Sequence, residues 1–189
     1  LLNAATLAET DGPAAQSLLE DIRNRHFDVY PEELDDPDIA AQFHAHFDEL
    51  ADILKAVSLI RECSIRARDH IVSFGERLNA QLMTQLLRNS GSLTEYVDAR
   101  ELIITDKRYD GARVLVDTSY ANIQQRVTEN QIYVVTGFIA SSQDGITTTL
   151  GRGGSDYTAA LIGAALDAPQ IEIWTDVDGF MSADPRKVD

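Results

Sequence analysis

Residues 147–156 read Thr-Thr-Thr-Leu-Gly-Arg-Gly-Gly-Ser-Asp, and an apolar segment typical of a helix follows them directly. The three glycines allow the backbone to approach a ligand closely. The start of the following helix offers unpaired N–H groups and the positive end of the helix dipole. Arg152 adds a planar guanidinium group that suits a carboxylate or a phosphate. The stretch therefore predicts a loop that holds a small anionic molecule, and this favours an enzyme.

The sequence around this loop alternates strand and helix patterns. Short apolar or β-branched runs are typical of strands, and they occur at residues 102–104, 114–116, 132–135 and 171–174. The run at 132–135 indicates a strand buried on both faces. Asp144-Gly145 predicts a hairpin turn between strands at 138–140 and 147–149.

Helices are expected between these strands. We expect one over residues 118–128 and another that begins at Ser155 or Asp156, acting as the N-cap, and ends near residue 167. A strand, a helix and a second strand in this order form a crossover unit, which predicts a parallel α/β sheet.

The first half of the chain, to about residue 89, predicts a helical lobe. Pro13 suits the first turn of a helix that runs to about Arg25. Two further helices are indicated by apolar residues spaced three and four apart. These two stripes are Ile39, Phe43, Phe47, Leu50, Leu54 and Val57, and then Phe74, Leu78, Leu82 and Leu86. Asn89-Ser90-Gly91 predicts the end of the last helix.

Composition narrows the classes of function. The chain has 189 residues, 44% of them hydrophobic, and a formal net charge of −15. Residues 1–50 hold 12 Asp and Glu against two Arg, so nucleic acid and anionic membranes are poor partners. The one cysteine, Cys63, falls in a predicted helix and cannot form an internal disulfide. This favours a reducing compartment, and we expect a cytoplasmic protein.

Three further stretches carry candidate chemistry. Residues 73–77, Ser-Phe-Gly-Glu-Arg, read either as a capping box or as a glutamate directed at a ligand's ammonium group. Phe138, in Thr136-Gly137-Phe138, is either a core residue or the wall of a pocket. Residues 174–186 hold three aspartates and Arg186, which suit ribose, phosphate or indirect Mg²⁺ binding, although Asp-Gly and Asp-Pro are also ordinary turn formers.

Together these motifs, in this order, resemble those of aspartate kinases in the amino-acid kinase family. The resemblance implies an α/β fold, a three-layer α/β/α sandwich with a mostly parallel sheet, preceded by the helical lobe. Residues 1–90 would form the lobe and 91–189 the part with the substrate and nucleotide loops. It also implies transfer of the γ-phosphoryl group of ATP to the β-carboxylate of L-aspartate, in the synthesis of lysine, threonine and methionine. Mg²⁺ would be held mainly through the nucleotide phosphates, and we expect a homo-oligomer.

The resemblance also implies residue roles. Glu76 would hold the ammonium group of aspartate and Arg152 its α-carboxylate, while Phe138 would line the pocket. Contacts with the anionic groups of the substrate would come from Gly153, Gly154 and Ser155.

Ser155 and Asp156 are the candidate catalytic residues, because Asp156 would organise the charged transfer site. The implied nucleotide contacts are Thr175, Asp176, Met181, Asp184 and Arg186.

Alternatives remain open. A related kinase could act on glutamate, acetylglutamate, carbamate or UMP, and a non-catalytic scaffold could use the helical lobe as an interaction surface. The family's Lys-Phe-Gly-Gly-Thr-Ser loop and regulatory domains have no counterpart in residues 1–189, so we expect this segment alone to be inactive.

Overall fold

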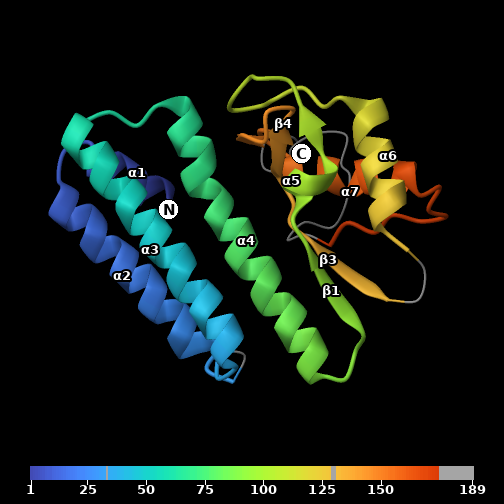
Figure 1. Cartoon of the computed structure of the whole chain (residues 1–189), viewed down its shortest axis with the longest axis horizontal. Coiled ribbons are helices and arrows are strands. Elements are labelled where there is room, and N and C mark those ends of the chain that lie inside the picture. The colour runs from blue at the N-terminus through green and yellow to red at the C-terminus, as the bar shows by residue number, and fades with distance from the viewer. Residues whose placement is uncertain (33, 129–130, 175–189) are drawn as a thin grey trace, which may run out of the picture.

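The computed structural model describes residues 1–32, 34–128 and 131–174. Helices fill its first half, namely α1 (Leu2–Ala8), α2 (Gly12–Val29), α3 (Pro37–Ile60) and α4 (Ile65–Asn89). Figure 1 shows α1, α2 and α3 packed side by side, with α4 between them and the strands. We call α1–α4 the helical lobe, and its presence confirms the helical first half predicted from the sequence.

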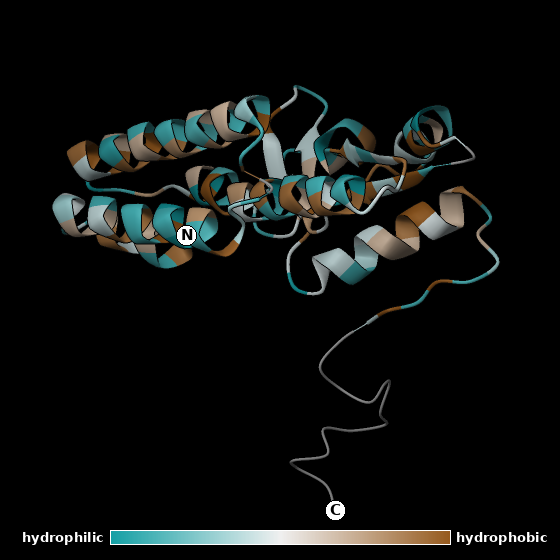
Figure 2. Ribbon diagram, turned by 90° about the horizontal axis from the view of Figure 1, so that it is seen from below, coloured by the Kyte–Doolittle hydropathy of each residue, from teal (hydrophilic) through white to brown (hydrophobic). Residues whose placement is uncertain are grey.

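Local sequence explains where these helices begin. The Asp11 side chain accepts a hydrogen bond from the Ala14 N–H at 3.0 Å, with Pro13 in the first turn of α2. Asp36 caps α3 and Ser64 caps α4 in the same way. The predicted apolar stripe of α3 is buried from Phe43 to Val57. In Figure 2 the helices of the lobe carry both hydrophilic and hydrophobic residues along their lengths, as expected of helices with one buried face.

The second half alternates strands and helices. It contains β1 (Thr94–Val97), α5 (Ala99–Leu102), β2 (Ile104–Thr105), α6 (Val116–Arg126), β3 (Ile132–Val135), β4 (Ile139–Ser142), β5 (Thr147–Thr149) and α7 (Gly154–Ala165). β1 pairs in parallel with β3 and β2 with β4, while β4 and β5 form the predicted antiparallel hairpin. α4 packs on one side of the strands, and α6 and α7 lie on the other (Figure 1). These three layers confirm the α/β fold class.

Two of the predicted strands are wrong or displaced. Residues 114–116 form no strand, because Val114 makes an isolated bridge to Thr105 and α6 begins at Val116. The run 102–104 is divided between the end of α5 and the start of β2. Leu102, Ile103 and Val114 are buried in one hydrophobic core without a longer strand at either place, so local β propensity did not decide the structure.

The predictions for β3 and residues 171–174 also need correction. β3 is only partly buried, and Ile132 at its start is exposed. Among the described residues β3 pairs with β1 alone, so one of its edges has no partner. Residues 171–174 form no strand, and Trp174 is 89% exposed. Ile171 instead lies against Gly163 of α7, where a Cβ atom would collide with it.

The prediction that Cys63 lies in a helix is wrong. Cys63 is in the connection between α3 and α4. Its N–H donates to the carboxylate of Glu9 at 2.9 Å, which ties this connection to the end of α1. Burial raises the pKa of its thiol. No helix within the described ranges combines the length and hydropathy that crossing a bilayer requires.

Candidate active site

The glycine-rich loop follows β5 and forms a tight turn. The N–H of Gly154 donates to the carbonyl of Gly151 at 3.0 Å, and Arg152 lies exposed at the tip of this turn. Gly151 and Gly153 have φ values of 73° and 71°, in the left-handed region that favours glycine. A Cβ on Gly151 would also lie 3.2 Å from Cα of Gly111. The glycines are therefore explained by the backbone of this turn.

The start of α7 differs from the prediction. Gly153, not Ser155 or Asp156, is the N-cap residue, and no side chain caps the helix. The left-handed turn feeds straight into the helix, so Ser155 and Asp156 fall inside its first turn with exposed side chains. Their side chains and the N–H groups of this turn are left available to a ligand, as is usual at an uncapped helix N-terminus.

Phe138 connects β3 to β4 in a strained turn. Its φ is 67°, and the N–H of Ile139 donates to the carbonyl of Gly137 at 2.7 Å. Such a γ-turn with positive φ at a non-glycine residue is rare, and it persists where the surroundings hold it. Here the N–H of Phe138 donates to the Thr158 hydroxyl at 3.1 Å, and its carbonyl accepts from Leu150 at 2.8 Å.

Close packing explains the glycines beside Phe138. A Cβ on Gly137 would lie 3.1 Å from Cα of Ser155, and one on Gly154 would lie 2.9 Å from the Phe138 ring. The β3–β4 turn and the start of α7 therefore fit together only because both positions lack a side chain.

Glu76 lies about three turns after the start of α4. The capping-box interpretation is wrong, because Ser73 lies within the helix and its hydroxyl donates to the carbonyl of His70 at 2.7 Å. Glu76 is half-buried, and burial raises the pKa of its carboxyl group. Within the described ranges no hydrogen bond or ion pair involves this carboxyl group, which is therefore available for a cationic ligand.

The structure brings these groups together around one cavity of about 410 Å³. Its lining consists of Glu76, Phe138, Gly151, Arg152, Gly153, Gly154, Ser155 and Asp156. Every predicted substrate-binding and catalytic residue is thus at this cavity. A neighbouring cavity of about 530 Å³ shares Glu76 and Ser155 and extends along β3 and α7. An acid from α4 and a guanidinium from the loop after β5 can therefore reach the same small molecule.

No feature of the sequence indicated the largely buried charge network where α4 meets the end of β1. Asp98, just after β1, accepts hydrogen bonds from Arg100 at 2.6–3.0 Å and lies 3.9 Å from Arg77 of α4. Burial alone would raise the pKa of Asp98, but the hydrogen bonds and charge of Arg100 outweigh it and keep that pKa below its ordinary value. Burial and the charge of Arg77 lower the pKa of His46 to about 4. Because Arg77 Nη2 also lies 2.8 Å from His46 Nε2 of α3, the network connects α3, α4 and α5.

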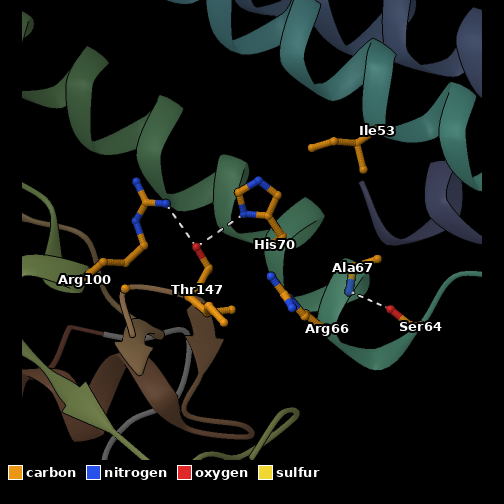
Figure 3. Close-up of a pocket in the computed structure, with 9 residues that line it drawn as sticks. Ile53, Ser64, Arg66, Ala67, His70, Arg100 and Thr147 are labelled. Carbon is orange, nitrogen blue, oxygen red and sulfur yellow. Dashed lines mark hydrogen bonds between the residues drawn. The ribbon is translucent and has the colours of Figure 1, made fainter. Parts of the chain in front are cut away.

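Another cavity, of about 430 Å³, lies where the first turns of α4 face the β4–β5 hairpin (Figure 3). Three of its polar residues, Thr147, His70 and Arg100, are paired with protein groups. The Thr147 hydroxyl at the start of β5 lies 3.1 Å from Arg100 Nη1 and 3.3 Å from His70 Nδ1. His70 also contacts Glu49 at 3.3 Å, and Arg100 is bound to Asp98. We regard these contacts as a support of β5.

The predicted nucleotide contacts Thr175, Asp176, Met181, Asp184 and Arg186 lie outside the described residues. Within the described ranges, no group of three or more His, Cys, Asp or Glu residues is arranged to hold a metal ion. Asp156 is the carboxylate that the cavity could direct at a cation held by a phosphorylated ligand.

Comparison with known proteins agrees with this geometry. A model of the amino acid kinase family matches residues 10–189. The chain belongs to the amino acid kinase family. Over its whole length the chain is 32% identical to the bifunctional aspartokinase/homoserine dehydrogenase 1 of Zea mays. The match covers 21% of the maize protein. The chain is 35% identical to the aspartokinase of Schizosaccharomyces pombe, over 77% of this chain and 29% of the yeast protein.

Solved structures of aspartate kinases share this fold. Aspartokinase III of E. coli, in complex with aspartate and ADP, superposes with a TM-score of 0.88 and 31% identity. The match covers 98% of this amino acid kinase chain and 42% of the E. coli chain. The aspartate kinase of Clostridium acetobutylicum superposes with a TM-score of 0.72 and 28% identity, over all of this chain and 40% of that one. The chain therefore spans less than half of each of these proteins.

Proposed function

We propose that the protein is an aspartate kinase, which transfers the γ-phosphoryl group of ATP to the β-carboxylate of L-aspartate. The observation that carries the proposal is the cavity shared by Glu76 and Arg152. These residues come from separate elements, and their opposite charges complement the ammonium group and the α-carboxylate of an amino acid. The relatives named aspartokinase, and the E. coli structure that holds aspartate and ADP, support this assignment.

The chemistry needs positioning more than proton transfer. The nucleophile is already an ionised carboxylate at neutral pH, so no side chain must act as a general base. Catalysis then consists of holding the β-carboxylate in line with the γ-phosphorus and neutralising the charge that develops there. The N–H groups of the first turn of α7 and the Ser155 hydroxyl suit an anionic group at the cavity, and Phe138 excludes water from one side.

The donor set also fits Mg²⁺ that arrives with ATP. Asp156 is exposed beside the start of α7, and it is the one acid besides Glu76 in the lining of the cavity. Mg²⁺ commonly keeps few protein ligands and is held by substrate phosphates. We therefore assign Asp156 to the metal–phosphate side and Glu76 to the ammonium side. The nucleotide contacts of residues 175–186, a homo-oligomeric state and a cytoplasmic location remain predictions.

Substrate analogues test the two charged contacts separately in the full-length protein. Succinate lacks the ammonium group of aspartate, and β-alanine lacks its α-carboxylate. Glu76→Gln should raise the KM for L-aspartate by roughly 30-fold or more, as expected when one partner of a desolvated charge pair is lost. The same substitution should leave the inhibition constant of succinate nearly unchanged. Arg152→Gln should raise the KM for L-aspartate while leaving β-alanine binding nearly unchanged.

Matched controls are Glu101→Gln and Arg68→Gln, which neutralise exposed residues away from the cavity. Neither should change the KM for L-aspartate. Weakening of succinate binding by Glu76→Gln equal to that of aspartate would contradict the assigned contact. Competition of N-acetylglutamate and UMP with L-aspartate for binding tests the alternative that the protein is a related kinase with another substrate. Binding of only a ligand without a free ammonium group would show that Glu76 is misassigned.

A further inference from the structure

We propose that Asp69 is a positioning residue that sets the distance between Glu76 and the glycine-rich loop. This inference rests on the proposed function, because it explains how the two halves of the aspartate site are kept in register. Asp69 is in α4, one turn after its start, and does not line the candidate site.

The Asp69 carboxylate makes three hydrogen bonds to segments distant in sequence. Oδ2 accepts the N–H of Thr149 at 3.0 Å and the N–H of Asp110 at 3.1 Å, while Oδ1 accepts the Thr149 hydroxyl at 3.0 Å. The residue is 3% exposed. Bonds of a carboxylate to N–H and O–H donors in a buried place are among the stronger hydrogen bonds in proteins. They fasten α4 to the last residue of β5.

The position of this attachment links the two charged groups of the site. Asp69 and Glu76 are seven residues apart, which is about two helical turns, so they lie on one face of α4 about 10 Å apart along its axis. Thr149, the partner of Asp69, comes three residues before Arg152. The path from Glu76 to Arg152 through the attachment is therefore short, and it consists of a rigid helix segment and the root of the loop.

Asp69 also holds the other wall of the loop. The N–H groups of Gly111 and Ala112 donate to the Thr149 carbonyl at 3.2 and 2.8 Å, and the backbone of Gly111 lies against Gly151. Asp69 accepts the N–H groups of both Asp110 and Thr149. It therefore fixes both chain segments at the base of the glycine-rich turn, the one before Gly111 and the one at the end of β5. The contacts of His70 and Arg100 with Thr147 support the other end of β5 (Figure 3).

The test compares Asp69→Ala with Asp69→Asn in the full-length protein. Asp69→Ala should raise the KM for L-aspartate by on the order of tenfold to a hundredfold, because small displacements of a binding group have large effects. The KM for ATP should stay within about twofold. Asparagine can accept the two N–H bonds with its carbonyl oxygen and donate to the Thr149 hydroxyl. Asp69→Asn should therefore restore most of the affinity for aspartate.

Thr84→Ala is the matched control. Thr84 is also a buried polar residue of α4, and its hydroxyl bonds only the Ala80 carbonyl within the same helix. The Thr84→Ala variant should have a lower melting temperature and an unchanged KM for aspartate. A change of KM in Thr84→Ala equal to that in Asp69→Ala would overturn the proposal, and so would an Asp69→Asn variant as impaired as Asp69→Ala. If Asp69→Ala does not fold, Thr149→Val removes only the bond to Oδ1, and an unchanged KM would overturn the proposal.

Amide hydrogen exchange separates failure of this inference from failure of the proposed function. Asp69→Ala should speed exchange in peptides that cover residues 109–112 and 147–153, whereas Thr84→Ala should not. This readout needs no knowledge of the substrate. Absence of aspartate phosphorylation by the wild-type protein would refute the proposed function alone. Unchanged exchange in Asp69→Ala would refute the attachment itself.

Discussion

Glu76 shows at the scale of one residue how a binding group can lower stability. Burial raises the pKa of its carboxyl group, so the folded protein holds this proton more tightly than the unfolded chain does. Ionisation of Glu76 therefore lowers the free energy of unfolding as the pH rises above the ordinary glutamate pKa, about 4.3. Glu76→Gln should raise the melting temperature of the ligand-free protein at neutral pH, and this gain should vanish well below that pKa.

The control for this prediction is Glu101→Gln, which alters an exposed carboxylate of α5. It should give no such gain in differential scanning calorimetry at either pH. A melting temperature lowered by Glu76→Gln at neutral pH would show that the carboxylate has a stabilising partner in the folded protein. Loss of aspartate affinity together with a gain of stability would identify Glu76 as a residue retained for binding.

At the scale of elements, the contact between the β3–β4 turn and α7 depends on Gly137. Gly137→Ala would push a methyl group against the backbone of Ser155, which cannot move without shifting the start of α7. We expect a loss of about 1–3 kcal/mol in the free energy of unfolding, as for other overpacked sites, and a raised KM for aspartate. Gly75→Ala is the contrast, because the space there is ordinary and α4 is continuous. It should stabilise by about 0.5–1 kcal/mol in urea denaturation.

At the scale of the whole molecule, the net charge of −15 opposes compaction. Added salt screens repulsion between exposed acids, so raising NaCl from roughly 0.01 to 0.15 M should raise the melting temperature. The double variant Asp48→Asn, Asp52→Asn neutralises exposed acids of α3. It should melt higher at low salt and respond less to added salt. A melting temperature that falls with salt would show that ion pairs outweigh the excess of acids.

Much of the fold could be predicted because its signals are local. The stripe from Phe43 to Val57 predicted α3, and Asp144-Gly145 predicted the β4–β5 hairpin. Errors arose where partners decide the structure. The run 171–174 has the composition of a strand, but pairing depends on a neighbour, and within the described residues it has none. Ser155 is a good N-cap type, yet the left-handed turn at Gly153 places the cap two residues earlier.

The candidate site divides in the same way. The family resemblance predicted that Glu76 and Arg152 bind the same substrate molecule. The structure places both at one cavity, and their roles stay predictions. Asp69 gave no signal in the sequence. Its partner Thr149 is 80 residues away, and an acid between Arg68 and His70 reads as an ordinary charged helix position. The γ-turn at Phe138 was equally hidden, because only its surroundings make a positive φ tolerable there.

The seven-residue spacing between Asp69 and Glu76 fixes both their separation along α4 and the direction of Glu76 about the helix axis. Inserting one residue between them would turn Glu76 by about 100° about the helix axis and carry it away from the cavity, although every side chain were kept. The same insertion in the connection around Cys63 would leave that direction unchanged. Insertions and deletions among relatives should therefore occur in the connection before Ser64 and be absent between residues 69 and 76.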